Sequence, residues 1–161
     1  MKTIIIMRHG KSSWKYDVGD RLRPLKTKGL NDAKLVSEQF LRISELPDKI
    51  FSSPAKRAFE TSKIFLKTSD KSENEVTIIE ELYDFNGRNV IDFLKNLDNN
   101  IDSVMIFGHN HAFTSISNIF GDNFIENLPT SGLVKISFNI DNWKSLKKGK
   151  TELIIFPKDL R

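Results

Sequence analysis

The chain has 161 residues, of which 39% are hydrophobic and 29% are charged, and it contains no cysteine. These values are typical of a soluble globular protein with one core, so we expect residues 1–161 to form a single domain. The lack of cysteine excludes disulfide bonds and thiol chemistry and fits a reducing compartment. The apolar run near the N-terminus is too short for a signal peptide, and no stretch approaches the ~18 apolar residues of a membrane span. We therefore expect a cytoplasmic protein with no membrane partner.

The net charge of +4 is concentrated at the start of the chain. Residues 1–30 hold eight Lys or Arg and two Asp, a net charge of +6, so the remaining chain carries about −2. A basic segment favours an anionic partner, either phosphate groups or a nucleic acid, although it is equally typical of a solvated lysine-rich surface. Because no nucleic-acid-binding motif accompanies the charge, we expect no nucleic-acid partner.

Short apolar runs alternate with segments of helical periodicity over the first 120 residues. The runs predict strands at 3–7, 49–52, 76–79 and 103–107, and the periodic segments predict helices at 27–43, 54–68, 90–97 and 112–120. Thr27 is expected to cap the first helix, and Pro54 suits the first turn of the second. Residues 11–26 and 69–75 predict loops, and 133–138 and 152–156 predict two late strands. The alternation predicts an α/β fold, a three-layer αβα sandwich with a mostly parallel central sheet.

Two of the predicted strands run into a histidine beside a glycine. The first is followed by Arg8-His9-Gly10, and the fourth by Gly108-His109-Asn110-His111. Ligands of open parallel sheets bind beyond the carboxyl ends of the strands. If the two strands are central neighbours, His9 and His109 face one cleft, and Arg57, one turn into the second helix, can reach it.

Two histidines and two arginines around one point suit phosphoryl transfer. A guanidinium group binds phosphoryl oxygens through two N–H groups at once. Catalysis of phosphoryl transfer depends mainly on positioning and charge stabilisation. The neighbouring Arg charges disfavour an imidazolium, so we expect His9 to stay neutral near pH 7. A backbone carbonyl, such as that of Gly10, can then hold the proton on one ring nitrogen while the other attacks.

Met7-Arg8-His9-Gly10 after an apolar strand resembles the signature of the histidine phosphatase superfamily, which has the phosphoglycerate mutase-like fold. The resemblance extends over nearly the whole chain and is closest to the short SixA-type phosphohistidine phosphatases. It rests on an ordered set of segments: RHGKSSW (8–14), DRLRPL (20–25), SSPAKRA (52–58), ELY (81–83), GHN (108–110), LPT (128–130) and FPK (156–158).

The resemblance implies that His9 is the phosphorylated nucleophile. It also implies that Arg8, Arg57 and His109 form the phosphate pocket. Three residues of the basic loop are expected to touch the substrate as well: Lys11, Ser12 and Arg23.

The general acid is implied less directly. The mutase-like branch uses a Glu, for which Glu81 is the nearest match, with Glu80 and Asp84 as competitors. The acid phosphatase branch has an Asp directly after the second His, where this chain has Asn110. Without a placed acid, esters with poor leaving groups are disfavoured, whereas a phosphohistidine leaves as an imidazole and needs less help.

These observations predict a metal-independent phosphatase that acts on phosphohistidine in a protein, for example a histidine-phosphotransfer domain. A chain without large insertions leaves the cleft open to such a partner, and the basic loop at 11–28 would flank an acidic one. Two alternatives remain within the same class, a small-molecule phosphomonoesterase and a phosphoglycerate mutase-like enzyme. A third, from another class, is a non-catalytic anion- or nucleic-acid-binding module.

Two further residues keep open roles at this point. His109 and His111 have the spacing of a metal pair, but no third ligand follows at a suitable distance, so we expect no metal and no other cofactor. His111 is either part of the cleft wall or the start of a helix. Trp14 is either an aromatic side chain at the lip of the cleft or an anchor for the loop.

Overall fold

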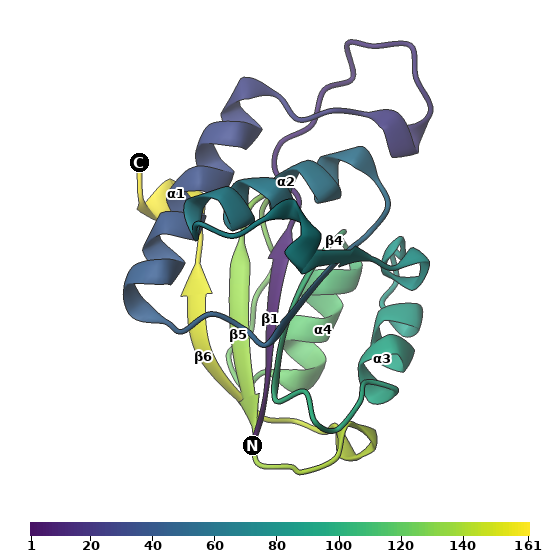
Figure 1. The fold of residues 1–161 in the computed structure, drawn as a ribbon, viewed down its shortest axis with the longest axis vertical. Coiled ribbons are helices and arrows are strands. Elements are labelled where there is room, and N and C mark those ends of the chain that lie inside the picture. Colours follow the sequence, from purple (N-terminus) through teal and green to yellow (C-terminus); the bar gives the residue numbers. More distant parts are fainter.

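The computed structural model describes residues 1–161, and its centre is one sheet of six strands (Figure 1). The strands are β1 (Lys2–Arg8), β2 (Lys49–Ser52), β3 (Val76–Ile78), β4 (Ser103–Gly108), β5 (Leu133–Phe138) and β6 (Lys150–Ile155). Their order across the sheet is β3-β2-β4-β1-β5-β6. The first four strands along the chain are mutually parallel, β5 runs antiparallel to β1, and β6 antiparallel to β5.

Four helices cover the two faces of this sheet (Figure 1). One face packs against α1 (Thr27–Ile43) and α2 (Lys56–Thr68), and the other against α3 (Arg88–Lys95) and α4 (Ala112–Phe120). Short 3₁₀ turns complete the chain at η1 (Asp20–Leu22), η2 (Glu73–Glu75), η3 (Glu80–Leu82), η4 (Trp143–Ser145) and η5 (Pro157–Asp159). The predicted αβα sandwich with a mostly parallel sheet is therefore confirmed.

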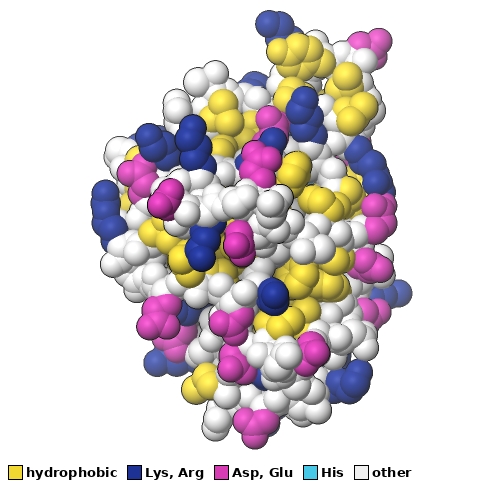
Figure 2. Space-filling view, viewed as in Figure 1, with side chains coloured by type: hydrophobic (Ala, Val, Ile, Leu, Met, Phe, Trp, Pro, Cys, Tyr) yellow, Lys and Arg dark blue, Asp and Glu magenta, His cyan; other side chains and the backbone are white.

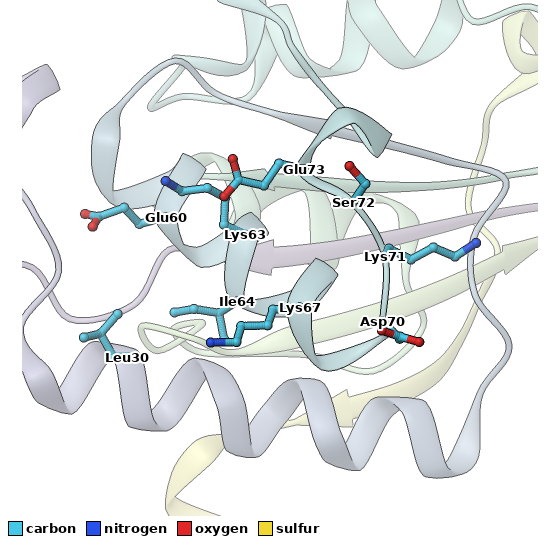
Figure 3. Close-up of a pocket in the computed structure, with 9 residues that line it drawn as sticks. All are labelled: Leu30, Glu60, Lys63, Ile64, Lys67, Asp70, Lys71, Ser72 and Glu73. Atoms are coloured by element: carbon cyan, nitrogen blue, oxygen red, sulfur yellow. The ribbon is translucent and has the colours of Figure 1, made fainter.

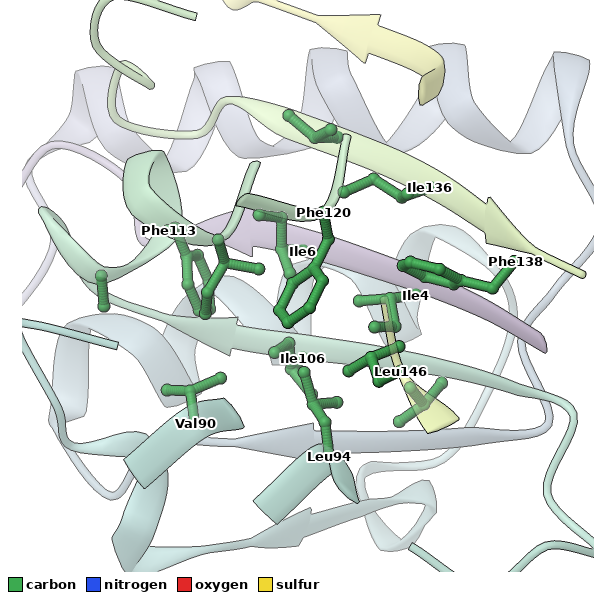
Figure 4. Packing of buried hydrophobic residues seen from close by; sticks show 14 of the residues in the cluster. Ile4, Ile6, Val90, Leu94, Ile106, Phe113, Phe120, Ile136, Phe138 and Leu146 are labelled. Atoms are coloured by element: carbon green, nitrogen blue, oxygen red, sulfur yellow. The ribbon is translucent and has the colours of Figure 1, made fainter. Parts of the chain in front are cut away.

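The alternation of side chains along β1 explains why it is apolar throughout. Ile4 and Ile6 belong to the core under α3 and α4, where Figure 4 shows them beside Phe120 and Ile106. Ile5 and Met7 point to the opposite face and join the core under α1 and α2. A strand with helices on both faces must be apolar at every position, so the apolar run of residues 3–7 correctly predicted a buried strand.

The two strands that carry the histidines are direct neighbours. β1 and β4 pair in parallel, with Met7 opposite Phe107 and Arg8 opposite Gly108. The backbone N–H of His9 then donates to the carbonyl of Gly108, at 3.1 Å. The condition on which the shared cleft depended, that the first and fourth strands are neighbours, is therefore met, and it brings His9 and His109 to the same edge of the sheet.

The boundaries differ from the sequence predictions at several helix starts. Thr27 is the first residue of α1 rather than its cap, since the extended residue before the helix is Lys26. Likewise α2 begins at Lys56 after an extended Ala55, so Pro54 precedes the first turn.

The third helix begins and ends two residues earlier than the sequence predicts, and the reason is physical. The carboxylate of Asp84 accepts hydrogen bonds from the backbone N–H groups of Gly87 and Val90, at 3.1 Å each. Gly87 has φ of 102°, which favours glycine, and it lets the chain enter α3 at Arg88. None of the helices combines the length and apolar character that a membrane crossing requires.

The segment after β1 lies directly against the first turn of α1. A Cβ built on Gly10 would lie 2.8 Å from the carbonyl oxygen of Gly29, and one built on Gly29 would overlap the backbone of Lys11. Both positions therefore require glycine, because the chain that carries His9 must pass this helix at close range.

We expect Gly29→Ala to lower the free energy of unfolding by about 1–3 kcal/mol, because the added methyl group forces the helix away from the segment after His9. Gly19→Ala is the matched control, since nothing lies within 4 Å of its Cβ position. The control should be neutral or stabilising by up to about 1 kcal/mol. Urea denaturation of both variants measures the difference, and equal stabilities would contradict the close approach.

Candidate active site

His9 follows β1 and is held in one orientation. Its Nδ1 lies 2.7 Å from the carbonyl oxygen of Gly10, so the ring donates its proton there. The other nitrogen, Nε2, carries no proton, and its lone pair accepts a hydrogen bond from Nε of Arg57 at 3.4 Å. The backbone around the ring is fixed as well, because the N–H of Ser131 donates to the carbonyls of both Arg8 and His9. The arrangement presents a neutral imidazole with an unprotonated Nε2 beside Arg57.

Burial lowers the pKa of His9 to about 3, against the opposing effect of its hydrogen bond to Gly10. The charges of Arg57 and Arg8 lower the pKa further. The expected neutrality of His9 thus has two causes, and burial is larger than the arginine charges that the sequence suggested.

His109 follows β4 and is fully buried. Its Nε2 lies 2.8 Å from Oγ of Ser53, and that Oγ accepts a hydrogen bond from the backbone N–H of Ala55. The Ser53 hydroxyl can therefore donate its own proton to Nε2, which leaves a proton on Nδ1. Burial lowers the pKa of His109 to about 3, and the neighbouring His9 and Arg57 lower it further. The rings of His9 and His109 are 5.4 Å apart between centroids.

Arg8 and Arg57 approach the same point from β1 and α2. Arg8 donates from Nη1 to the carbonyl of Leu128 at 2.8 Å, and its Nε is buried without a partner. Burial, followed by the charge of Arg57, lowers the pKa of Arg8. Thr61 connects α2 to the segment after His9, since its Oγ1 accepts from the N–H of Gly10 and donates to the carbonyl of Arg57. An anion between the two guanidinium groups would relieve their repulsion and satisfy the free donor.

Asp20 orients Arg57. The guanidinium donates from Nη1 to the carbonyl of Asp20 at 2.7 Å and from Nη2 to its Oδ2 at 2.9 Å. The hydroxyl of Tyr83 donates to the same carboxylate. Partial burial acts to raise the pKa of Asp20, but the hydrogen bonds from Tyr83 and Arg57 and the Arg57 charge outweigh it and lower the pKa to about 2. Asp20 is therefore an anion at neutral pH.

The loop between β1 and α1 forms one wall of the site, and Arg23 holds it together. The guanidinium donates from Nη2 to Oγ of Ser12 at 2.6 Å and from Nε to the carbonyl of Ser13 at 3.2 Å. It also lies over the ring of Trp14. Because these donors are already engaged, Arg23 supports the loop more than it offers free hydrogen bonds to a substrate.

These residues surround a pocket of about 280 Å³. Three of the expected substrate contacts, Lys11, Ser12 and Arg23, lie in its wall. The complete lining is Arg8, His9, Lys11, Ser12, Trp14, Asp20, Arg23, Arg57, Phe85 and Thr130. His109 lies behind this wall, within contact of His9 and Arg57. Trp14, whose role was open, lies at the lip and is also stacked on Arg23.

The structure does not bring Glu81 to the pocket. Glu81 is exposed on η3 and is absent from the pocket wall. Glu80 forms an ion pair with Arg21 instead, and Asp84 accepts backbone hydrogen bonds at the start of α3. The assignment of the acid to Glu81 therefore has no support in the geometry, because its 3₁₀ turn directs the side chain to solvent.

Asn110 and His111 lie at the start of α4, outside the pocket wall. Oδ1 of Asn110 accepts hydrogen bonds from the backbone N–H and the hydroxyl of Thr114, so it caps the start of α4. His111 is exposed where α4 begins and is not part of the pocket wall. No group of three or more His, Asp or Glu side chains is arranged to hold a metal ion.

A larger hollow of about 500 Å³ lies beside α1 and α2 (Figure 3). Three lysines line it together with three acidic residues, namely Lys63, Lys67, Lys71, Glu60, Asp70 and Glu73. It contains no histidine or arginine and mixes both signs of charge. We therefore place the candidate active site in the smaller pocket, where the chemistry-bearing residues converge.

Sequence reasoning missed several residues of the site, among them Asp20, Ser53, Tyr83 and Phe85. Tyr83 and Phe85 pack their rings on His109, with centroids 5.3 and 4.9 Å away. Ser53 had an available signal, because it follows β2, a strand next to β4. Asp20 stood within the DRLRPL segment, but nothing in its spacing predicted a contact with Arg57.

A sequence model described as the histidine phosphatase superfamily (branch 1) matches residues 4–90, more than half of the chain. The chain belongs to this superfamily. It is thus a phosphatase of the histidine-nucleophile type. None of the curated proteins matches it in sequence.

Several solved structures share the fold of this chain. The protein histidine phosphatase SixA, complexed with tungstate, has a TM-score of 0.83 and 20% identity, covering 99% of each chain. A protein from Agrobacterium tumefaciens, provisionally designated phosphohistidine phosphatase SixA, has a TM-score of 0.75 and 22% identity over 84% of this chain and 91% of its own. Phosphoserine phosphatase from Entamoeba histolytica, complexed with 3-phosphoglyceric acid, has a TM-score of 0.65 and 18% identity over 100% of each chain. At these identities the similarity establishes the fold of the superfamily.

Protonation of the two buried histidines should oppose folding. Their pKa is about 3 in the folded chain against an ordinary 6.5, so the unfolded chain binds more protons between pH 6.5 and pH 3. The free energy of unfolding should therefore fall as the pH falls through this window, by up to about 1.4 kcal/mol per pH unit for each histidine. Denaturation at several pH values should give a shallower dependence for His9→Gln/His109→Gln than for the wild type. Parallel curves would show that the rings are not held neutral.

Proposed function

We propose that the protein is a metal-independent phosphatase that hydrolyses phosphohistidine in a protein, through a phosphohistidine intermediate on His9. The observation that carries this proposal is the orientation of His9. Its Nδ1 donates to the carbonyl of Gly10, and its unprotonated Nε2 accepts a hydrogen bond from Arg57 beside His109. A neutral imidazole held in this way is ready to attack phosphorus without losing a proton first.

The cationic and neutral donors of the pocket match a phosphoryl group. Nε of Arg57 donates to Nε2 of His9, and its Nη2 lies 3.5 Å from Nδ1 of His109. With the Nδ1 tautomer of His109, both of these last atoms are donors, and a phosphoryl oxygen could accept from each. When a phosphoryl group enters, the Nε donor would turn from the ring to a phosphoryl oxygen and release the Nε2 lone pair for attack. Arg8 adds its buried, unpartnered Nε. These groups would stabilise the equatorial oxygens as charge shifts during transfer.

The reaction proceeds in two displacements. Nε2 of His9 attacks phosphorus, the bond from phosphorus to the substrate's imidazole nitrogen breaks, and the substrate ring leaves. If the other nitrogen of that ring is protonated, the leaving group is a neutral imidazole and takes no proton from the protein. Water then attacks the phosphorylated His9, which releases inorganic phosphate and restores the neutral ring.

The carboxylates around the pocket favour a phosphoramidate over an ester. An alkyl ester needs a proton on its departing oxygen, and a general acid contributes about 10²–10⁴-fold to such steps. Asp20, the one carboxylate in the pocket wall, has a pKa of about 2 and is ionised, while Glu81 faces solvent. A leaving imidazole has no such requirement, so phosphohistidine is the substrate class that this site serves best.

The size of the pocket supports a substrate attached to a protein. Small-molecule sites are commonly about 300–1,000 Å³, and this pocket of about 280 Å³ is at the lower limit. It would accept a phosphoryl group and an imidazole ring while the rest of the substrate stays outside. SixA, complexed with the oxyanion tungstate, is a protein histidine phosphatase with the same fold.

A phosphate ester is the alternative substrate, and the shared fold of a phosphoserine phosphatase complexed with 3-phosphoglyceric acid favours it. Such an enzyme, or a mutase, would need an acid that neither Asp20 nor Glu81 supplies in this geometry. The roles of His9, Arg8, Arg57 and His109, the single domain and the cytoplasmic location remain predictions.

We expect a brief reaction with a labelled phosphodonor, in the presence of a metal chelator, to give an acid-labile and base-stable phosphoenzyme. The label should be absent from His9→Ala and kept in His111→Ala, which changes an exposed histidine outside the pocket. Turnover of His9→Ala should fall on the order of 10³-fold or more, because the nucleophile is lost. Labelling of His9→Ala, or a requirement for added metal, would refute the mechanism.

We expect kcat/KM to decrease from phosphohistidine to p-nitrophenyl phosphate to phosphoserine, with about 10²-fold or more between the first and last. The reason is the rising need for a proton on the leaving group. Glu81→Gln should change each value by less than about twofold, since an exposed side chain outside the pocket contributes little. Hydrolysis of phosphoserine at the rate of phosphohistidine, or a selective loss of ester activity in Glu81→Gln, would instead support an ester phosphatase with Glu81 as its acid.

A further inference from the structure

The segment Trp14–Leu22, here called the rim loop, projects beside the pocket and exposes large apolar side chains. The loop extends beyond the helices at one end of the sheet (Figure 1), and yellow and dark blue side chains gather there in Figure 2. The exposed fractions are 76% for Trp14, 55% for Tyr16, 42% for Val18 and 61% for Leu22. Such a cluster of exposed aromatic and aliphatic groups is typical of an interaction surface.

We propose that the rim loop is a docking surface for an acidic protein that presents its phosphohistidine to His9. The inference rests on the proposed function and identifies the surface of the partner that the pocket serves. Phe85, 46% exposed, extends the same surface from the chain that follows η3.

The surface is continuous with the pocket. Trp14 and Phe85 both line the wall that contains His9. A protein whose phosphohistidine enters this small pocket must cover the lip with its own surface, so it must touch these rings. The rest of the rim loop, with Tyr16 and Leu22, extends outward from that contact.

Both ends of the rim loop are held in place before any partner arrives. The bridge between Ser12 and Leu25 closes its base, and Arg23 supports Trp14 from below. Arg21 lies over the ring of Tyr83, with 4.4 Å between the guanidinium carbon and the ring centroid. Preorganised aromatic side chains lose little freedom on binding and commonly become the anchors of an interface.

A second fixed point joins the rim loop to the catalytic groups. Asp20 lies within the loop and receives two hydrogen bonds from Arg57. The loop is therefore placed relative to the phosphate-binding arginine, so a partner that docks on it is also placed relative to His9.

The charge around the loop indicates an acidic partner. Lys11 and Lys15 are exposed beside the apolar cluster, and neither takes part in an ion pair. Residues 11–28, which contain the rim loop, hold six Lys or Arg against Asp17 and Asp20, a net charge of +4. Acidic side chains around the phosphohistidine would find unpaired cations here, and this attraction would raise the rate of encounter.

The test compares three phosphohistidine probes, each prepared with phosphoramidate: an acidic histidine-phosphotransfer domain, basic histone H4 and the free amino acid. For the wild type we expect kcat/KM to be highest on the acidic domain and to fall with added salt. Tyr16→Ala/Leu22→Ala should lower kcat/KM on this domain about tenfold. The same variant should act on free phosphohistidine like the wild type, because neither side chain lines the pocket.

The matched control is Ile43→Ala/Phe124→Ala, which removes two comparably exposed apolar side chains outside the rim loop and should leave all three rates unchanged. Lys15→Glu should lower the rate on the acidic domain and reduce its salt dependence. Equal rates of the wild type and Tyr16→Ala/Leu22→Ala on the acidic domain would overturn the docking surface, as would no preference over histone.

Two other results would point elsewhere. Binding of the wild type to vesicles of phosphatidylglycerol and phosphatidylcholine, lost in Tyr16→Ala/Leu22→Ala, would assign the surface to a membrane and overturn the proposal. Inactivity of the wild type on all three phosphohistidine probes, with activity on esters, would instead refute the proposed function on which the docking surface rests.

Discussion

A neutral imidazole buried beside two guanidinium groups is the constraint on which the rest of this site depends. In the mechanism that we propose, His9 attacks phosphorus, and it can do so only if its ring carries one proton and directs that proton away from the pocket. The carbonyl of Gly10 meets the second condition, and burial meets the first by lowering the pKa of the ring. The parallel pairing of β1 with β4 then supplies a second neutral ring, His109, at the same edge of the sheet.

The polar groups around this ring serve two purposes at once. Asp20 neutralises part of the positive charge in the pocket and also fixes the guanidinium of Arg57. Thr61 joins the backbone after His9 to the helix that carries Arg57. These contacts hold Arg57 close to Arg8 despite the repulsion between their charges. The site therefore favours a phosphoryl anion without having to rearrange. Through Asp20 and Trp14, part of the surface that we assign to the partner protein is held in place as well.

Most of the framework could be predicted from the sequence, because burial leaves a periodic pattern. The apolar runs located the six strands, and two of them led into His9 and His109 on strands that proved to be neighbours. The contacts of Asp20 could not be predicted, since they join residues 37 and 63 positions apart through an irregular loop that has no period. Glu81 was assigned by resemblance alone, and the orientation of a 3₁₀ turn cannot be read from that. Pro54 fitted a helix start, but the extended backbone at Ala55 delayed the helix.

The tip of the rim loop forms no polar contacts with the rest of the molecule. Tyr16, Asp17 and Val18 take part in no hydrogen bond or ion pair, whereas the base of the loop is closed by Ser12 and Leu25. Substitutions at the tip are thus free of the structural penalties that apply around His9. Phosphatases with the same catalytic site could therefore differ in their partner proteins by exchanging this short segment. An engineered variant could likewise carry a different recognition segment there while the catalytic residues stay unchanged.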